Sequence, residues 1–415
     1  MHAPQELELT ISDVAHGGIF VARHEGRVVF VSDAIEGETV RARISDDSKS
    51  SFWRAETVEV LEASPHRQAH VWSAADVSVA PPLRPGGAEF GHITLAHQRA
   101  LKSKVLRDSL ARFAKIDSDV SVQGVAGQTD GTRWRTRVSL HVDGAGRIGP
   151  YAARSHNVIE VNDLPLATAA VERAADKLYG DNADRIDLIQ AADGHVRVLN
   201  RTLDDKGQPV ERQASKREVL IERVGDREFR VDADGFWQVH HDAAATLDGA
   251  VRRALRDVEI DPNAWHLDLY GGVGLFAATV AELGGTRVTS VEFNARATEH
   301  AGENLSEWIG ARAETARVDR YTRALLTNAS ERERARLRDG VVVIDPPRAG
   351  AGKNVVSDLA NLAPRAIVYV ACDPVALARD LGTFAERGYA LAGIEAFDLF
   401  PHSHHLETVA LLQQA

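Results

Sequence analysis

Apolar residues recur with two different periods along the chain, and the period changes near residue 235. In residues 5–62 they alternate every second residue in short segments, as Leu7, Leu9 and Ile11 do, and Gly26 interrupts one segment as a hairpin turn would. Several short strands at this spacing predict a small barrel, of which the oligonucleotide-binding barrel is one kind. We therefore expect an N-terminal barrel domain at residues 1–63.

Between residues 64 and 234 the pattern is mixed. Prolines mark a loop at 64–87, and apolar residues at helical spacing predict a helix at 93–113, which also carries Lys102 and Lys104. Strands are expected within 121–162, and a second helix at 166–179. This mixture predicts an α+β central domain at residues 64–234.

From residue 235 onward, apolar runs that predict strands alternate with patterns that predict helices. The expected strands cover 265–270, 288–292, 341–345, 366–371 and 390–397, and the expected helices include 243–255 and 275–283. Alternation of this kind predicts a mostly parallel, doubly wound sheet with a Rossmann-like order of elements. The chain is thus predicted to be of the α/β class, with its largest domain at residues 235–415.

Polar residues and glycines stand where the expected strands end, which is where open α/β sheets bind their ligands. Gly271, Gly272 and Gly274 follow the first of these strands, Glu292 ends the next, and Asp345 ends the one before Pro346-Pro347. Glycines let the backbone approach a cofactor, and a carboxylate at the position of Glu292 can accept hydrogen bonds from ribose hydroxyls. A nucleoside site and a purely structural glycine turn are both compatible with this pattern.

Cys372 is the only cysteine, and it follows the apolar run 366–371. It is either a small buried apolar residue or a reactive thiol at the end of a strand. One cysteine excludes an internal disulfide and a zinc or iron–sulfur site built from cysteines of one chain.

Glu407 precedes another apolar run, where burial would raise its pKa and suit it to act as a general base. Although His404 and His405 are adjacent to it, no ligand set at metal spacing accompanies them, so we expect no metal.

The charge and hydropathy of the chain limit the kinds of partner that it can bind. The formal net charge of −11 argues mildly against nucleic acid, because neutralising phosphates requires Lys and Arg. The segment 64–234 is the least acidic and contains local basic clusters, so a basic face for RNA is compatible with an acidic protein. No apolar run approaches the ~20 residues of a membrane span. Residues 1–6 lack the basic and apolar segments of a secretory leader, and we expect a cytoplasmic protein.

Taken together, these motifs resemble, in order and spacing, the S-adenosylmethionine-dependent RNA uracil-C5 methyltransferases. The resemblance covers nearly the whole chain, and its motifs are Phe-Trp-Gln-Val at 236–239, the glycine turn at 268–274, Glu292, Asp-Pro-Pro-Arg at 345–348, Cys-Asp-Pro at 372–374 and His-Leu-Glu-Thr-Val at 405–409. Residues 5–62 are similar to the TRAM barrel of this family, and 64–234 to its central domain. The resemblance implies a class I methyltransferase fold at 235–415, and tRNA or 23S rRNA as the partner of a monomeric enzyme.

The resemblance also implies a role for individual residues. Cys372 matches the nucleophile of the family, and Glu407 matches its base. The positions that match S-adenosylmethionine contacts are Gln238, Tyr270, Gly272, Glu292, Asp319 and Asp345. Candidates for RNA contacts are Arg348, Arg135 and Arg137, with Arg133, Arg147 and Arg154 as further basic residues; an ordinary solvated face is the alternative for these arginines.

The sequence departs from the family pattern at several positions. Many relatives hold an iron–sulfur cluster on four cysteines, whereas the matching positions here include Pro85 and Ala88 around Gly86-Gly87, and Leu164. The resemblance therefore implies a member without the cluster. Asp373 stands where asparagine is frequent, and Leu275 stands where some relatives place an asparagine.

Three other functions are compatible with parts of the pattern. The first is a methyltransferase that acts on a different atom or target, which would not need the Cys372 thiol. The second is an RNA-binding relative that has lost catalysis, which would fail to bind S-adenosylmethionine. The third, a nicotinamide oxidoreductase on a similar sheet, is disfavoured by the joint presence of Asp345-Pro346-Pro347 and Cys372.

Overall fold

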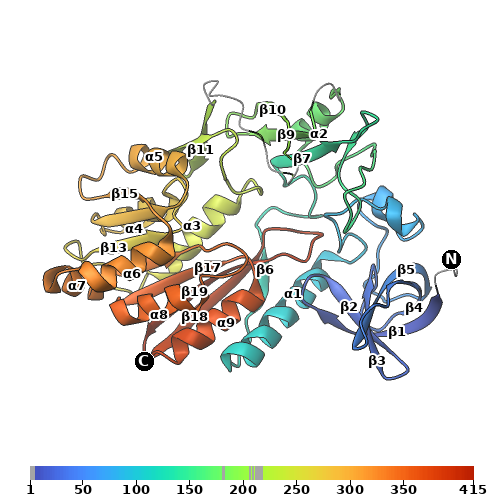
Figure 1. Ribbon diagram of the computed structural model, residues 1–415, viewed down its shortest axis with the longest axis horizontal. Coiled ribbons are helices and arrows are strands. Elements are labelled where there is room, and N and C mark those ends of the chain that lie inside the picture. The colour runs from blue at the N-terminus through green and yellow to red at the C-terminus, as the bar shows by residue number, and fades with distance from the viewer. Residues whose placement is uncertain (1–4, 180–182, 205–206, 208–209, 211–217) are drawn as a thin grey trace.

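The computed structural model describes residues 5–179, 183–204, 207, 210 and 218–415. The first four residues, on which the expectation of no secretory leader partly rests, lie outside the described residues. A small barrel and a large α/β layer lie side by side, and a smaller sheet lies above and between them (Figure 1). Within the described part of the chain, no helix is long and apolar enough to cross a membrane.

The N-terminal strands form the expected barrel. β1 (Glu6–Ala15), β2 (Ile19–His24), β3 (Arg27–Ser32), β4 (Thr39–Asp46) and β5 (Phe52–Glu62) close in the order β1-β2-β3-β5-β4. The alternating apolar side chains point inward and are buried, as Leu9, Ile11 and Val31 show. Gly26, in the tight β2–β3 turn, has a φ of 80°, which is why the chain can reverse there.

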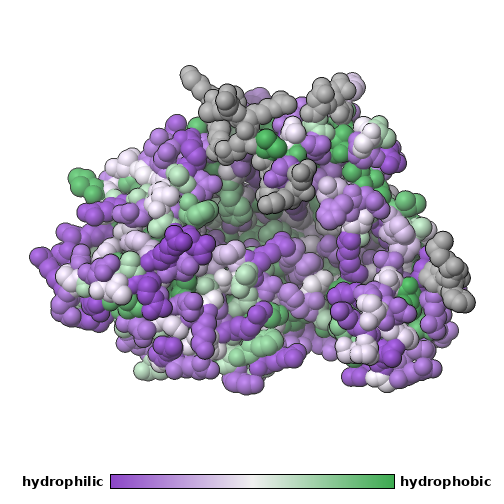
Figure 2. Space-filling model, in the orientation of Figure 1, coloured by the Kyte–Doolittle hydropathy of each residue, from purple (hydrophilic) through white to green (hydrophobic). Residues whose placement is uncertain are grey.

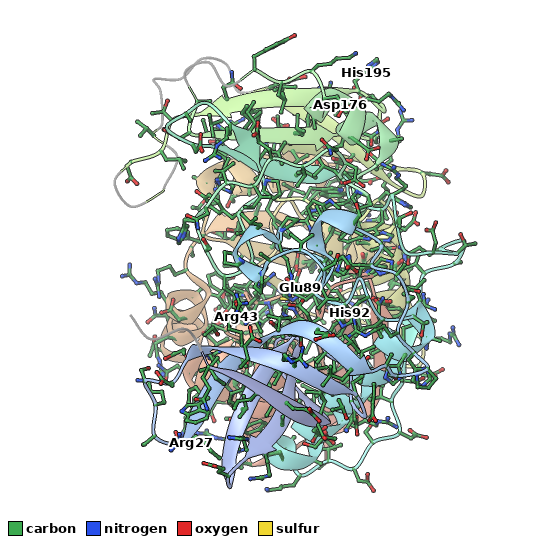
Figure 3. The ribbon with its side chains drawn as sticks, turned by 90° about the vertical axis from the view of Figure 1, so that its right-hand side faces the viewer. Arg27, Arg43, Glu89, His92, Asp176 and His195 are labelled. Carbon is green, nitrogen blue, oxygen red and sulfur yellow. The ribbon has the colours of Figure 1, made fainter. Side chains whose placement is uncertain are left out.

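A loop with two short 3-10 helices, Ser73–Ala75 and Pro81–Leu83, connects the barrel to the rest of the chain. The guanidinium of Arg84, 3% exposed, donates to the carbonyl oxygens of Thr57 and Val79 and to Asp33 Oδ2 at 2.8 Å. Viewed from the barrel side, Glu89 and His92 lie in this connection, between the barrel below and the central sheet above (Figure 3). The loop is therefore fixed by polar contacts and by a small apolar cluster that includes Trp72, Ala75 and Ala88.

The central sheet has the order β10-β9-β7-β8, with β7 (Arg137–Val142), β8 (Ile148–Gly149), β9 (Arg185–Gln190) and β10 (Val196–Arg201). The helix expected at 166–179 is shorter, since α2 spans only Ala169–Ala175. Thr168 is extended and its side chain accepts a hydrogen bond from Val171 N, so it caps the helix and stops it from starting earlier. A hairpin of β11 (Val219–Val224) and β12 (Arg227–Asp232) follows.

The C-terminal region forms the expected doubly wound sheet, in the order β15-β14-β13-β16-β17-β19-β18-β6. The strands β13 to β17 are parallel, and β19 runs antiparallel to both β17 and β18. The strands are β13 (His266–Leu269), β14 (Val288–Glu292), β15 (Arg312–Thr315), β16 (Val341–Ile344), β17 (Ala366–Ala371), β18 (Tyr389–Asp398) and β19 (Glu407–Gln414).

Helices cover both faces of this sheet, as the alternation of patterns predicts (Figure 1). The core on one face includes side chains of α6, α7, α8 and α9, and the core on the other includes those of α3 and α4. The helices are α3 (Ala243–Ala254), α4 (Leu275–Glu282), α5 (Ala295–Asn304), α6 (Val318–Asn328), α7 (Glu331–Arg338), α8 (Gly352–Leu362) and α9 (Pro374–Ala385).

One strand of the large sheet comes from the first half of the chain. β6 (Val122–Gly124) pairs in parallel with β18 and forms the edge of the sheet. The helix α1 (Leu95–Ser109), which continues as a π-helical turn Leu110–Ala114, contributes Leu106 and Leu110 to the core on the α8 and α9 face. The predicted boundaries at residues 63 and 234 stay predictions, but part of 64–234 is built into the C-terminal sheet.

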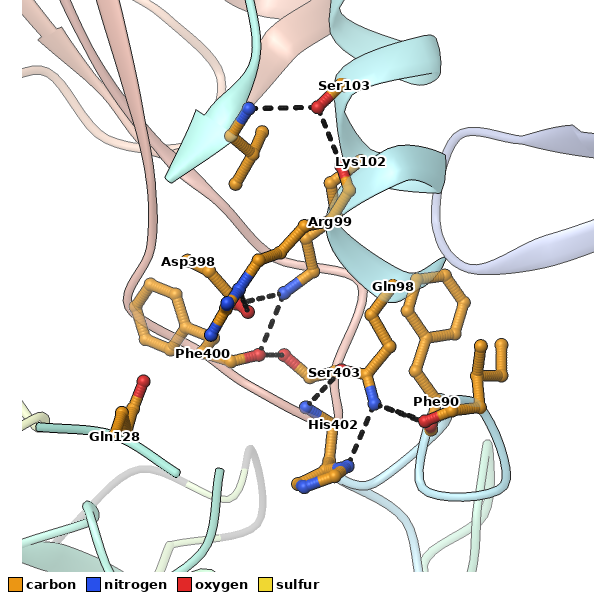
Figure 4. Close-up of polar contacts among 12 residues, drawn as sticks. Phe90, Gln98, Arg99, Lys102, Ser103, Gln128, Asp398, Phe400, His402 and Ser403 are labelled. Carbon is orange, nitrogen blue, oxygen red and sulfur yellow. Dashed lines mark hydrogen bonds and ion pairs between the residues drawn. The ribbon is translucent and has the colours of Figure 1, made fainter. Parts of the chain in front are cut away.

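A buried polar network joins α1 to the segment that leads into β19 (Figure 4). Lys102, 1% exposed, donates from Nζ to Asp398 Oδ1 at 2.6 Å and to the carbonyl oxygen of Phe400 at 3.0 Å. Gln98 Oε1 accepts from His402 N at 2.8 Å, and its Nε2 donates to the carbonyl oxygen of Phe90 at 3.1 Å. These contacts fix the path of residues 398–403, immediately before Glu407.

The Lys102–Asp398 pair provides a test of this anchoring. We expect Lys102→Met to lower the free energy of unfolding by about 3 kcal/mol, because it leaves a buried carboxylate whose remaining ion pair among the described residues is with Arg99. Urea denaturation of the two proteins measures the difference.

Lys104→Met is the matched control, because Lys104 is one third exposed and pairs with Asp13 and Glu36 at the surface. Its expected cost is less than about 1 kcal/mol. Equal destabilisation by the two substitutions would contradict the importance of the buried pair.

Candidate active site

The register of the sheet brings the sequence motifs to one edge. Leu269 of β13 lies beside Ile344 of β16, and Ile344 lies beside Tyr369 of β17. These strands are parallel, so the residues that follow them, including Tyr270 and Asp345, meet at the carboxyl edge of the sheet.

Cys372 and Glu407 are placed by an antiparallel pair. Ala371, the last residue of β17, is the register partner of Thr408 in β19, and Thr408 Oγ1 donates to the carbonyl oxygen of Ala371 at 3.0 Å. In an antiparallel ladder the residue after Ala371 faces the residue before Thr408. The half-buried thiol of Cys372 and the carboxyl of Glu407, 5% exposed, are therefore neighbours.

A cleft of about 2260 Å³ runs between the C-terminal sheet and the central sheet. In the space-filling view, the face of the molecule that is turned toward the reader is hollowed near its centre, and apolar surface lies inside the hollow (Figure 2). Small-molecule sites are usually about 300–1,000 Å³, so the cleft has room for more than one ligand. Of the residues singled out from the sequence, the cleft is lined by Gln238, Tyr270, Gly272, Glu292, Asp345, Arg348, Cys372, Glu407 and Arg135.

The glycine turn after β13 forms a cradle at one end of this cleft. Tyr270 and Gly272 have φ values of 62° and 54°, and a Cβ at Gly271 would lie 2.0 Å from Ser290 Oγ. Gly272 N donates to Glu292 Oε2 at 3.2 Å, so the turn and the acid at the end of β14 are held together. A Cβ built at Gly272 meets no atom within 4 Å, which leaves the backbone open to a ligand.

Asp268 offers a buried acceptor beneath the cradle. Its Oδ2 accepts from Ala277 N at 3.0 Å and from Ser290 Oγ at 3.2 Å. Its Oδ1 is buried without a hydrogen-bond partner among the described residues. Asp268 is fully buried and does not line the cleft, so this oxygen belongs to the interior beneath the turn.

The pKa values of Asp345, Glu407 and Cys372 in the cleft, and of the buried Asp268 beside it, are all raised. Burial raises the pKa of Asp268 to about 7, and burial together with the charge of Asp268 raises the pKa of Asp345 to about 7. Burial and the charge of Asp345 raise the pKa of Glu407 well above its ordinary value. Burial and then the charges of Glu407 and Asp345 raise the pKa of Cys372 to about 12. Such a cluster favours a cationic ligand, which would stabilise the ionised carboxyl groups.

The sequence candidates Arg137, Asp319, Arg133, Arg147 and Arg154 do not line the cleft. Arg137 Nη1 donates to the carbonyl oxygen of Gly235 at 2.7 Å, and Arg137 forms an ion pair with Glu222, so its guanidinium supports the wall instead. Asp319 lies in the first turn of α6 and pairs with Arg317 at 3.0 Å. Its charge reaches the site only indirectly, as one cause, after burial, of the raised pKa of Tyr270.

Comparison with known protein families matches the N-terminal barrel and the C-terminal part of the chain separately. A family model described as tRNA (Uracil-5-)-methyltransferase matches residues 168–415, and a TRAM domain model matches residues 4–58. The chain belongs to the tRNA (uracil-5-)-methyltransferase family. The prediction of an RNA methyltransferase with an N-terminal TRAM barrel is thus confirmed at the level of the family.

Relatives match this family member along its whole length. A protein of Streptomyces avermitilis named "Uncharacterized RNA methyltransferase" is 36% identical and is matched over 99% of both chains. A protein of Bifidobacterium longum with a similar name is 32% identical over 98% of this chain and 96% of its own. The solved structure of Pyrococcus abyssi tRNA (uracil-54, C5)-methyltransferase with S-adenosyl-L-homocysteine is 20% identical, with a TM-score of 0.70 over 97% of this chain and 99% of that one, and shows the same fold.

The positions that match cluster-binding cysteines of relatives carry no ligand atoms here. Ala88 is buried in an apolar cluster with Trp72 and Trp134, and Leu164 packs against the same cluster. Apolar packing therefore occupies this part of the family fold in this member.

Two exposed aromatic residues of the cleft were not expected from the sequence. Phe236 is 74% exposed and Phe293 is 72% exposed, and both line the cleft. Exposed large apolar side chains in a cleft are typical of ligand contacts. The sequence signal that could have identified them is their position beside predicted cofactor contacts. Phe293 directly follows Glu292, and Phe236 stands two residues before Gln238.

The raised pKa of Cys372 predicts an unusual pH dependence of its alkylation. An ordinary thiol, with a pKa of about 8.5, reacts at nearly its full rate by pH 10. A thiol with a pKa of about 12 stays protonated there, so its rate should still rise tenfold per pH unit between pH 8 and 10. The chain has one cysteine, so the intact mass after reaction with iodoacetamide reports on Cys372 alone.

Removing a neighbouring negative charge should shift this profile to lower pH, as we expect for Glu407→Gln and Asp345→Asn. The control is Glu395→Gln, which alters a carboxyl on β18 that pairs with Arg253. A wild-type rate that levels off near pH 9 would contradict the raised pKa.

Proposed function

We propose that this enzyme transfers a methyl group from S-adenosylmethionine to carbon 5 of a uridine in tRNA or 23S rRNA. In this proposal Cys372 is the nucleophile and Glu407 is the base. The main support is the antiparallel register that sets these two side chains opposite each other in the wall of the cleft. The chain's membership of the family supports the same reaction.

The chemistry of uracil explains why a thiol and a base are needed together. C5 of uracil is a weak nucleophile. When the sulfur of Cys372 bonds to C6, the electron pair of the C5–C6 double bond moves toward O4 and makes an enolate. C5 would then take the methyl group from the cofactor, whose methyl–sulfur bond breaks and whose sulfur keeps that electron pair as a neutral thioether. Glu407 removes the proton that remains on C5, the double bond forms again, and the bond to Cys372 breaks.

The residues of the cradle fit S-adenosylmethionine. Glu292 is placed to accept from ribose hydroxyls, and the open backbone at Gly272 allows close approach. When bound, the cofactor supplies an electrophilic methyl group on a positively charged sulfur. The ligand in the Pyrococcus abyssi structure, S-adenosyl-L-homocysteine, is consistent with this assignment.

Protonation states set the order of events at Cys372 and Glu407. In the free enzyme the thiol is neutral, because its pKa is about 12, so its proton must leave as the bond to C6 forms. Glu407 must be ionised when it takes the C5 proton, although burial and Asp345 raise its pKa. A positive charge in the cleft lowers the pKa of a nearby carboxyl, so a bound cation favours the ionised base.

The RNA has to present an unstacked base to this site. Cys372 lies at the end of a buried strand, so a uridine within a duplex cannot reach it, and extruding the base costs a few kcal/mol, least in a loop. Arg135 and Arg348 line the same cleft and suit a phosphate or a uracil carbonyl. Mapping 5-methyluridine in tRNA and 23S rRNA of a strain that lacks the protein identifies the substrate.

The nucleophile assignment predicts the behaviour of Cys372→Ala. We expect methylation to fall by at least roughly a thousandfold, because C5 cannot be activated, while S-adenosylmethionine binding measured by calorimetry stays unchanged. Normal methylation by this variant would instead favour transfer to another atom, such as an exocyclic amine, and loss of cofactor binding by the wild type would favour a non-catalytic RNA-binding protein.

The base assignment predicts that Glu407→Gln accumulates a covalent protein–RNA adduct. The variant can form the bond to C6 and transfer the methyl group, but it cannot remove the C5 proton that precedes release of the thiol. Denaturing gel electrophoresis with labelled RNA detects the adduct. Glu395→Gln, the matched surface substitution, should turn over without one; free turnover by Glu407→Gln would remove Glu407 from this role.

A further inference from the structure

A second, smaller cavity reaches Cys372 from the side of the barrel. Its volume is about 110 Å³, and one wall is the barrel turn Ala15–Gly18 between β1 and β2. The opposite wall includes Leu101 and Val105 of α1. This cavity shares Cys372, Arg348 and His405 with the large cleft, but Glu407 and the cofactor cradle line only the cleft.

The barrel turn is attached to the residue that follows the thiol. His16 Nε2 donates to Asp373 Oδ2 at 2.9 Å. The other carboxyl oxygen of Asp373 accepts from Val375 N at 3.0 Å and from Ala376 N at 2.8 Å, and so caps α9. One aspartate thus connects the barrel to the helix that begins beside Cys372.

The same turn packs against the segment that leads to Glu407. Gly18 has a φ of 70°, and a Cβ at this position would lie 2.8 Å from His404 Cβ. Only glycine fits such a close approach with this backbone conformation. The turn therefore contacts the chain on both sides of the Cys372–Glu407 pair, through Asp373 and through His404.

We propose that this cavity binds the base of a nucleotide next to the target uridine, so that the barrel completes the substrate site. The inference rests on the proposed function, because it needs an RNA strand whose target base occupies the cleft beside Cys372 and Glu407. That strand continues past the target, and the edge shared by the two cavities at Cys372, Arg348 and His405 is a direct path between them.

Size and lining both suit a single ring. A dry cavity of about 150 Å³ holds a benzene molecule, so an open cavity of about 110 Å³ matches one six-membered ring better than a whole nucleoside. Val105, which is partly exposed, offers apolar surface to the face of a base, and the buried side chains of Phe90 and Leu101 lie at the same wall. Arg348, His404 and His405 offer polar groups to its edge, and the phosphate that joins the two nucleotides can lie beside Arg348.

Filling the cavity tests this assignment. Val105 is partly buried at the cavity wall, so Val105→Phe adds a ring there without entering the centre of the core. We expect kcat/KM for an RNA hairpin that the wild type methylates to fall at least tenfold, with unchanged binding of S-adenosylmethionine in calorimetry. Val28→Phe, on the outer side of β3, is the matched control and should methylate like the wild type. Equal activity of Val105→Phe and the wild type would overturn the assignment.

Abasic RNA identifies the group that occupies the cavity. Removing the base on one side of the target uridine should lower kcat/KM of the wild type about tenfold, and should have no further effect on Val105→Phe, because the cavity is already filled. If the abasic site lowered kcat/KM of Val105→Phe by the same factor as it lowers that of the wild type, the assignment would be overturned. His16→Ala, which opens the wall and releases Asp373, should also weaken the response to the abasic site.

A binding measurement separates this inference from the proposed reaction. The same hairpin with 5-fluorocytidine, a single-ring base, at the neighbouring position should shift its ¹⁹F NMR signal on binding Cys372→Ala, and should not do so on binding Cys372→Ala/Val105→Phe. If the wild type forms no 5-methyluridine while this signal persists, the proposed reaction fails and the base-binding cavity stands. If methylation occurs without the signal, the cavity assignment fails alone.

Discussion

The antiparallel insertion of β19 between β17 and β18 is the constraint on which the site depends. In a purely parallel sheet every strand would deliver its last residue to the ligand edge. Because β19 runs in the opposite direction, it brings its first residue, Glu407, to the edge where β17 delivers Cys372. A thiol and a carboxyl thereby face each other on rigid backbone, and in the proposed reaction the thiol bonds to the base and the carboxyl takes a proton.

The surrounding structure opposes the charges that the reaction needs. Burial raises the pKa of Asp268, Asp345 and Glu407, and burial with the charges of Glu407 and Asp345 raises that of the Cys372 thiol. A cationic ligand in the cleft would compensate the ionised carboxyl groups. In the proposed reaction the cofactor is that ligand, so its binding also prepares the base.

The sequence predicted most strands of the sheet, because their apolar runs are local signals, but it did not predict β15, whose side chains are mostly exposed. The glycine turn, Glu292 and Asp345 could be placed at strand ends for the same reason. The pairing of Cys372 with Glu407 could not be derived from spacing, because it depends on the register of two strands that are not consecutive. Lys102 looked like an ordinary helix-surface lysine, and only its burial against Asp398 reveals its structural role. Arg137 was selected for its charge, which Glu222 compensates within the wall.

The position of β6 has a consequence for how the chain can be divided. This strand covers the outer edge of β18, and α1 packs on the same domain, although both precede the central sheet in the sequence. A fragment beginning at residue 235 would leave the β18 edge bare, with unpaired backbone groups that can recruit another chain. The chain therefore cannot be cut into independent domains in sequence order, because a strand from its first half completes the edge of the sheet that its second half forms.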